Sequence, residues 1–294
     1  MTEPQDDSQD EAQSRRGVGG FLRSETGIRL ISAIVMIALA LGTTWQGGAV
    51  FAVLWLAAGS AILFEWIAMV WIARRIPSVV AGALAYTAFV LAHLTGWPPV
   101  ALTAIALAGG ALVVMISTEW RDRIWAGAGY AVALVVVAVP LLVRDHPALG
   151  ALGILWIFAV VWGTDIAAYF TGRSLGGPKL WPRLSPKKTW SGFAGGLVAA
   201  MLAGFLLGLV ARLWGQDLPF DLWALTLLSG IASVVGQLGD LAESALKRHF
   251  DVKDSSRLIP GHGGVMDRLD AFFAVCLLIG LLMLGLSPFG ILAG

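Results

Sequence analysis

The chain has 294 residues, of which 57% are hydrophobic and only 13% are charged, and its formal net charge at pH 7 is +1. Soluble domains carry about a quarter charged residues, so this composition excludes an ordinary water-soluble protein. The near balance of charge gives no sign of a basic nucleic-acid surface, and we expect no nucleic-acid partner.

Apolar segments along the chain predict an all-α fold, a polytopic bundle of about nine transmembrane helices, because one crossing needs roughly 20 mostly apolar residues. Residues 1–24 precede these segments and lack the apolar core of a signal peptide, which predicts a disordered cytoplasmic tail. We expect N-terminal transmembrane helices in 25–150 and a C-terminal catalytic transmembrane region with cytoplasmic loops in 151–294. The nine segments are 28–45, 48–71, 77–95, 99–117, 124–143, 149–171, 192–212, 222–246 and 270–292.

Basic residues are distributed unevenly between the two sides of this predicted bundle. The chain has 20 Lys and Arg residues, and all but Arg144 and Arg212 fall on the side that holds the N-terminus. Since Lys and Arg gather in cytoplasmic loops, the N-terminus is predicted to be cytoplasmic. We therefore expect a multi-pass protein of the cell inner membrane with its polar loops facing the cytoplasm.

The first five segments contain few polar residues. Glu65 lies inside the second and His93 near the end of the third. For both we favour a polar group satisfied within the bundle, while a ligand cavity beside Glu65 remains an alternative. Cys276, the only cysteine, is interpreted as a small apolar packing residue.

Polar groups gather in the second half of the chain. Asp165 lies near the end of the sixth segment, and the following loop contains Ser-Pro-Lys-Lys-Thr at 185–189. Two lysines at a membrane surface could simply bind anionic headgroups. One face of the eighth helix carries Asp240, Glu243, Ser244 and Lys247. These residues could form a functional site, or Lys247 could pair with Asp240 or Glu243 in an ion pair that closes the helix end.

The segment Pro260-Gly-His-Gly-Gly264 precedes the last helix. Its glycines permit a nest of backbone N–H groups, which beside a helix N-terminus predicts an anion site. Asp267 and Asp270, three residues apart, favour a shared divalent cation, although they would also complement the helix dipole. His262 could act as a base, as a hydrogen-bond donor to a phosphate, or only as a turn residue.

At these positions the sequence resembles the phosphatidate cytidylyltransferase (CDP-diacylglycerol synthase) family. Runs 185–189 and 239–244 look like the family's upstream motifs, whereas Ser191 and Ser256 depart from its usual Glu or Gln and Gly. The family signature, Ser-x-x-Lys-Arg, Lys-Asp and Pro-x-His-Gly-Gly ending in Asp-Arg-x-Asp, is met by Ser244, Lys247, Arg248, Lys253, Asp254, Pro260, His262, Gly263, Gly264, Asp267, Arg268 and Asp270.

The resemblance implies transfer of the cytidylyl group of CTP to phosphatidate, giving CDP-diacylglycerol and pyrophosphate for phospholipid biosynthesis. It implies Mg²⁺ on Asp240, Asp267 and Asp270, with a second monovalent cation such as K⁺ nearby, and Lys247 bridging Asp240 and Asp267. The three aspartates and Lys247 are the expected catalytic residues. The expected substrate-binding residues are Asp165, Ser185, Lys187, Lys188, Ser244, Arg248, Lys253, His262, Gly263, Gly264 and Arg268.

The expected partners are CTP, phosphatidate and the lipid bilayer, and a homodimer is also considered. A CTP-dependent polyprenol or lipid kinase is the nearest alternative, because it uses related motifs and the same nucleotide. A transporter is the non-enzymatic alternative. It is disfavoured because the charges lie at one surface and the chain shows no repeated halves.

Overall fold

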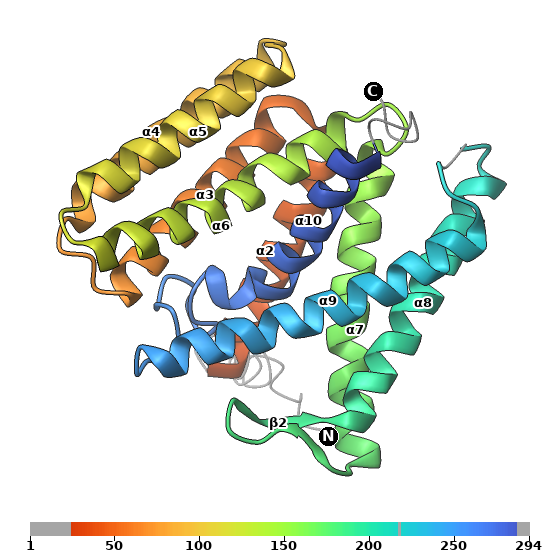
Figure 1. Cartoon of the computed structure of the whole chain (residues 1–294). Coiled ribbons are helices and arrows are strands. Elements are labelled where there is room, and N and C mark those ends of the chain that lie inside the picture. Colours follow the sequence, from red (N-terminus) through yellow and green to blue (C-terminus); the bar gives the residue numbers. More distant parts are fainter. Residues whose placement is uncertain (1–24, 217–218, 287–294) are drawn as a thin grey trace, which may run out of the picture.

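A computed structural model describes residues 25–216 and 219–286, and within them the chain forms a bundle of helices with one small β-hairpin (Figure 1). The predicted tail at 1–24 lies outside the described residues. The elements are α2 (Glu25–Gln46), α3 (Gly48–Met69), α4 (Arg75–Leu94), α5 (Pro99–Ile116), α6 (Trp120–Asp145), α7 (Gly150–Leu175), β1 (Lys179–Trp181), β2 (Ser185–Thr189), α8 (Trp190–Leu213), α9 (Leu222–His249) and α10 (Met266–Leu286).

Each of the nine helices in the described ranges is long and apolar enough to cross a membrane. The predicted all-α polytopic bundle is therefore confirmed, and each predicted segment overlaps one helix. Three boundaries differ from the prediction by four residues: α6 begins at Trp120 instead of 124, α7 ends at Leu175 instead of 171, and α10 begins at Met266 instead of 270. Helix α10 begins earlier because its first backbone amides find acceptors, as described below.

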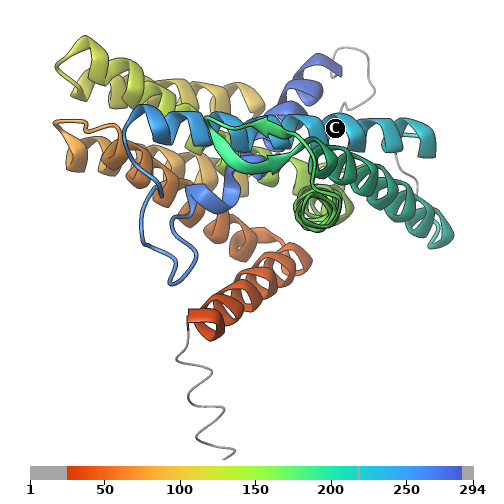
Figure 2. The ribbon, with the colours of Figure 1, turned by 90° about the horizontal axis from the view of Figure 1, so that it is seen from below.

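Successive helices run in opposite directions, so the connections that follow α3, α5, α7 and α9 lie at one end of the bundle (Figure 1). We call this the polar end, because the hairpin β1–β2 and the α9–α10 loop (residues 250–265) both lie there. Seen from this end, the hairpin crosses α9 while α2 lies to one side of the bundle (Figure 2).

The core joins the two predicted regions of the chain. Trp55 of α3 stacks on Phe272 of α10, with ring centroids 4.7 Å apart, and Phe272 also stacks on Phe158 of α7 at 5.8 Å. Helix α10 therefore packs against helices from both halves, and residues from both halves can meet at its N-terminus.

Helix α8 approaches its neighbours closely because it carries a small residue at every fourth position. These buried residues face α7 and α9, and they are Gly192, Gly196, Ala200, Gly204 and Gly208. Small residues allow helix backbones to pack closely in a membrane, where no hydrophobic force drives helices together. This packing brings α7 and α9, and the polar residues near their ends, toward one another.

Candidate active site

Three carboxylates form a cluster where α9 packs on α10. Asp240 and Glu243 come from α9 and Asp270 from α10, and one oxygen of each lies within 4.8 Å of the others. The helices approach closely here because Gly239 has no side chain: a Cβ at this position would collide with Ala274. Carboxylate oxygens at this spacing are the donors that Mg²⁺ prefers, so the residues present fit a divalent cation.

Two lysines contact this carboxylate cluster. Lys188 of β2 forms an ion pair with Asp240. Lys247 Nζ lies 3.3 Å from Glu243 Oε2 and 2.7 Å from Asp267 Oδ1. The family resemblance implies that Lys247 bridges Asp240 and Asp267. In the structure Lys247 contacts Asp267, but its second carboxylate partner is Glu243.

Glu243 was expected on the same helical face as Asp240, with an ion pair to Lys247 as an alternative, but it was not predicted as a metal ligand. Its side chain is almost fully buried, and neither carboxylate oxygen makes a hydrogen bond with the described residues, although the Lys247 ammonium lies 3.3 Å from Oε2. Burying a carboxylate is costly unless it is paired or bound to a cation, so a metal ion would add to the compensation from Lys247. Its position on the same helical face as Asp240 was the signal in the sequence.

Asp165 of α7 adds another negative charge to this region. It lies within electrostatic range of Asp240, Asp270, Lys188 and Arg268. Together with Glu243 and Asp267, these carboxylates outnumber the lysines that contact them. An excess of carboxylates of this kind favours a bound cation.

Alternation along β2 separates the two lysines of the 185–189 run. Lys188 points toward Asp240, whereas Lys187 is exposed on the opposite side of the strand. Ser185 is half-buried at the start of the strand, and Thr189 at its end accepts the Gly192 amide at 3.1 Å and so caps α8. The hairpin therefore has one side directed at the carboxylates and one side directed outward.

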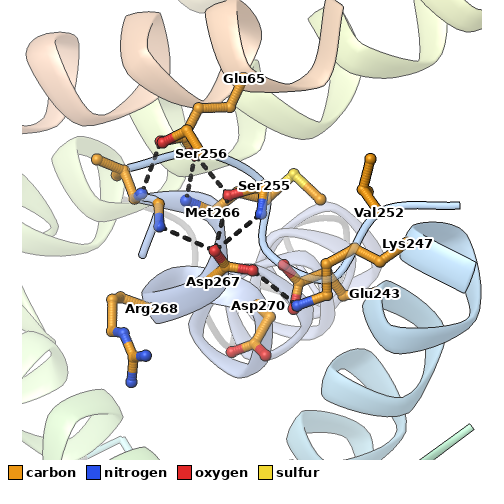
Figure 3. A network of polar contacts seen from close by, with 12 residues as sticks. Glu65, Glu243, Lys247, Val252, Ser255, Ser256, Met266, Asp267, Arg268 and Asp270 are labelled. Carbon is orange, nitrogen blue, oxygen red and sulfur yellow. Dashed lines mark hydrogen bonds and ion pairs between the residues drawn. The ribbon is translucent and has the colours of Figure 1, made fainter. Parts of the chain in front are cut away.

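Asp267 is held by four donors. Its Oδ1 accepts from Lys247, and its Oδ2 accepts from the Gly264 amide at 2.8 Å and from the amide and hydroxyl of Ser255, both at 3.0 Å (Figure 3). The family resemblance implies Mg²⁺ at Asp267, and that role stays a prediction. In the structure the Asp267 oxygens hold Lys247 and the α9–α10 loop.

The N-terminus of α10 is also occupied by carboxylates of the chain itself. Val265 and Met266 donate their backbone N–H groups to Glu65 of α3, while Gly264 donates to Asp267 (Figure 3). The glycines of this segment predict a nest of amides that binds an anion. These three amides bind anions as expected, but the anions are side chains. Glu65 is satisfied within the bundle, as favoured above.

Glycine is required at two positions of the turn, for a different physical reason at each. Gly263 has φ +85°, a conformation that costs other residues energy. A Cβ at Gly264 would collide with Ser255 Oγ and would lie 2.8 Å from the Glu65 carboxylate. Both glycines shape the loop around the two carboxylates.

The remaining predicted residues lie at the polar end with different degrees of exposure. Ser244 is half-buried on α9, whereas Arg248 and Lys253 are exposed, and Arg248 donates to Val252 O at 3.3 Å. Arg268 Nε donates to the carbonyl of His262 at 2.9 Å. Burial, together with the charge of Arg268, lowers the pKa of His262, which favours its neutral ring.

An apolar cavity of about 230 Å³ adjoins the carboxylate cluster. Glu243 and Asp270 form its polar wall, and its apolar walls include Trp66, Leu246 and Phe273. The site thus combines charged groups with a space suited to hydrocarbon.

The sequence matches a known protein family and named relatives. A family model described as the cytidylyltransferase family matches residues 27–285. The chain is similar to a phosphatidate cytidylyltransferase of Brucella suis biovar 1, with 41% identity over 266 residues, 85% of this chain and 90% of that protein. It is also similar to a phosphatidate cytidylyltransferase of Bacillus subtilis, with 50% identity over 133 residues, 45% of this chain and 48% of that protein.

Proposed function

Because the chain belongs to the cytidylyltransferase family, we propose that it transfers the cytidylyl group of CTP to phosphatidate, giving CDP-diacylglycerol and pyrophosphate. Two observations outside the comparisons support this proposal. The cluster of Asp240, Glu243 and Asp270 fits the divalent cation that accompanies a nucleotide, and an apolar cavity adjoins it. The carboxylate cluster is the observation that carries the proposal.

The proposed reaction needs positioning more than proton transfer. A phosphate oxygen of phosphatidate forms a bond to the α-phosphorus of CTP, and the bond from that phosphorus to the bridging oxygen breaks. Pyrophosphate leaves with the electron pair. Since a phosphate oxyanion is already a nucleophile at neutral pH, the barrier lies in bringing two polyanions together, which requires fixed positive charge.

The side chains divide this task. Asp240, Glu243 and Asp270 would hold Mg²⁺, which supplies the charge that draws the triphosphate and the lipid phosphate together. Lys188 and Lys247 keep further positive charge beside the carboxylates. We assign Asp267 to anchoring Lys247 and the α9–α10 loop, and a monovalent cation beside the same carboxylates remains part of the proposal.

We also propose that the polar end faces the cytoplasm across the cell inner membrane. The described residues of the polar end carry most of the basic side chains, and Arg144 and Arg212 lie in helices near the other end. CTP would then reach the site from the cytosol and phosphatidate from the inner leaflet. A homodimer in the bilayer stays a prediction.

A labelling experiment tests the reaction directly. Purified protein is incubated with phosphatidate, Mg²⁺ and CTP labelled at either the α- or the γ-phosphorus, and the lipid is then extracted. We expect α-label in the lipid, γ-label in water as pyrophosphate, and no product once EDTA removes the metal. A parallel incubation replaces phosphatidate with a polyprenol. A CTP-dependent lipid kinase would place γ-label in that lipid, and this result would overturn the proposal.

A further inference from the structure

We infer that Glu65 is a positioning residue of this site. Although it belongs to α3, it fixes the α9–α10 loop and so sets where Asp267 and Lys247 lie beside the carboxylate cluster. This inference rests on the proposed function only for its catalytic consequence. The structural part concerns a loop and a buried carboxylate, and both can be tested without either substrate.

The Glu65 carboxylate is fully buried, with 0% of the residue exposed, and each oxygen has a matched pair of donors. Its Oε1 accepts from the Val265 amide at 2.8 Å and the Ser256 hydroxyl at 2.5 Å. Its Oε2 accepts from the Met266 amide at 2.7 Å and the Ser255 hydroxyl at 3.1 Å (Figure 3). The sequence separation of about 200 residues makes these contacts purely tertiary.

These donors explain how a charge can be buried in an apolar bundle. Two of them are backbone amides at the start of α10, which otherwise lack partners within the helix. The positive end of the helix dipole also favours an anion there. Glu65 therefore acts as a cap supplied by another helix, and it fixes where α10 begins.

A continuous set of contacts leads from Glu65 to the cluster. Ser255 Oγ lies 3.1 Å from Glu65 and 3.0 Å from Asp267, so its single proton is shared between the two carboxylates. Asp267 then holds Lys247 at 2.7 Å, and Lys247 contacts Glu243 at 3.3 Å. Any displacement of the loop thus moves the Lys247 ammonium, which lies beside the proposed metal ligands.

Glu65 does not itself fit a ligand of the substrate or the metal. Both of its oxygens are already engaged by two donors, and its side chain has no accessible surface. Its effect must therefore pass through the loop. Neighbouring groups that orient ligands are commonly worth about 10- to 100-fold in metal affinity.

The test substitutes Glu65→Gln. Each carboxylate oxygen accepts a backbone amide, so whichever way the glutamine amide is turned, its NH₂ group faces an N–H that cannot accept. We expect hydrogen exchange of the Val265 and Met266 amides to accelerate about tenfold or more, since one bond to a charged group is lost. Mn²⁺, measured by electron paramagnetic resonance as a substitute for Mg²⁺, should bind about tenfold more weakly.

Asp122→Asn is the matched control. Like Glu65, Asp122 is a buried carboxylate that accepts a backbone amide from outside its own helix, the Ala73 N–H at 3.2 Å. This variant should leave exchange in 250–266 and Mn²⁺ affinity unchanged. If Glu65→Gln behaves as wild type in both measurements, or if both variants show the same losses, the inference is overturned.

A second pair of variants covers the case in which Glu65→Gln does not fold. Ser255→Ala removes the hydroxyl shared by Glu65 and Asp267. Ser256→Ala removes a bond to Glu65 and the acceptor of the Leu258 amide, but no contact with Asp267. We expect Ser255→Ala to weaken Mn²⁺ binding more than Ser256→Ala, and equal effects would contradict the path through Ser255. These measurements need no CTP or lipid, so absent turnover in the wild type would count only against the proposed reaction.

Discussion

At the scale of single residues, the adjacent lysines of β2 show how geometry separates similar groups. The family resemblance implies that both Lys187 and Lys188 bind substrate. In the structure Lys188 pairs with Asp240, while Lys187 lies on the exposed side of the strand. Successive side chains of a strand point to opposite faces, so only one of two neighbours can reach the site.

This difference gives a prediction about activity. Lys188→Met should lower kcat/KM for CTP about 100-fold, the typical cost of removing one fixed electrostatic group. Lys187→Met serves as its control and should cost less than about threefold, as for an exposed charge. Steady-state kinetics of CDP-diacylglycerol formation measures both. Equal losses in the two variants would show that the hairpin does not direct Lys188 alone into the site.

At the scale of elements, the small-residue face of α8 sets the separation of α7 and α9. Gly204 is its tightest point, because a Cβ there would collide with Ser229 Oγ. Ser229 in turn accepts a hydrogen bond from Trp156 Nε1 at 2.8 Å, which ties α9 to α7. Helix packing within the membrane thus depends on a position that carries no side chain.

We therefore expect Gly204→Ala to lower the free energy of unfolding by about 1–3 kcal/mol, the usual cost of overpacking a close contact. Reversible unfolding of the purified protein in detergent measures this. Gly163→Ala on α7 is the control, since its Cβ would lie 3.9 Å from Ala203 Cβ, an ordinary contact. If the two variants unfold alike, close packing of α8 is not what stabilises this part of the bundle.

At the scale of the whole molecule, the direction of the helices places every group of the candidate site at one end. The connections after α7 and α9, far apart in sequence, supply the hairpin and the α9–α10 loop there (Figure 1). The distribution of Lys and Arg then predicts which compartment this end faces. Orientation is therefore a property of the assembled bundle that one labelling experiment can test.

Two exposed positions at opposite ends serve for this measurement. In intact cells an impermeant maleimide should label Ala148→Cys and should label Lys179→Cys only after the membrane is opened. The single native cysteine, Cys276, is buried, so the wild type should remain unlabelled and provides the control. Labelling of Lys179→Cys in intact cells would place the polar end outside and contradict the proposed orientation.

The sequence alone determined much of this description. Hydropathy predicted nine membrane-spanning helices, because the length of an apolar run reflects the thickness of a bilayer. The motifs of the second half predicted the family, and the spacing of Asp240 and Glu243 placed both on one face of α9. These features are local, so residue order and helical periodicity suffice to reveal them.

Only the tertiary structure decided which groups meet. It brought Asp270 to Asp240 and Glu243, directed Asp267 to Lys247 and Ser255, and placed Glu65 at the start of α10. The sequence does not reveal the partner of a carboxylate inside an apolar helix, because hydrogen bonds depend on distance and direction in space. The close approach of helices that the glycines permit, rather than the order of the residues, fixed those partners.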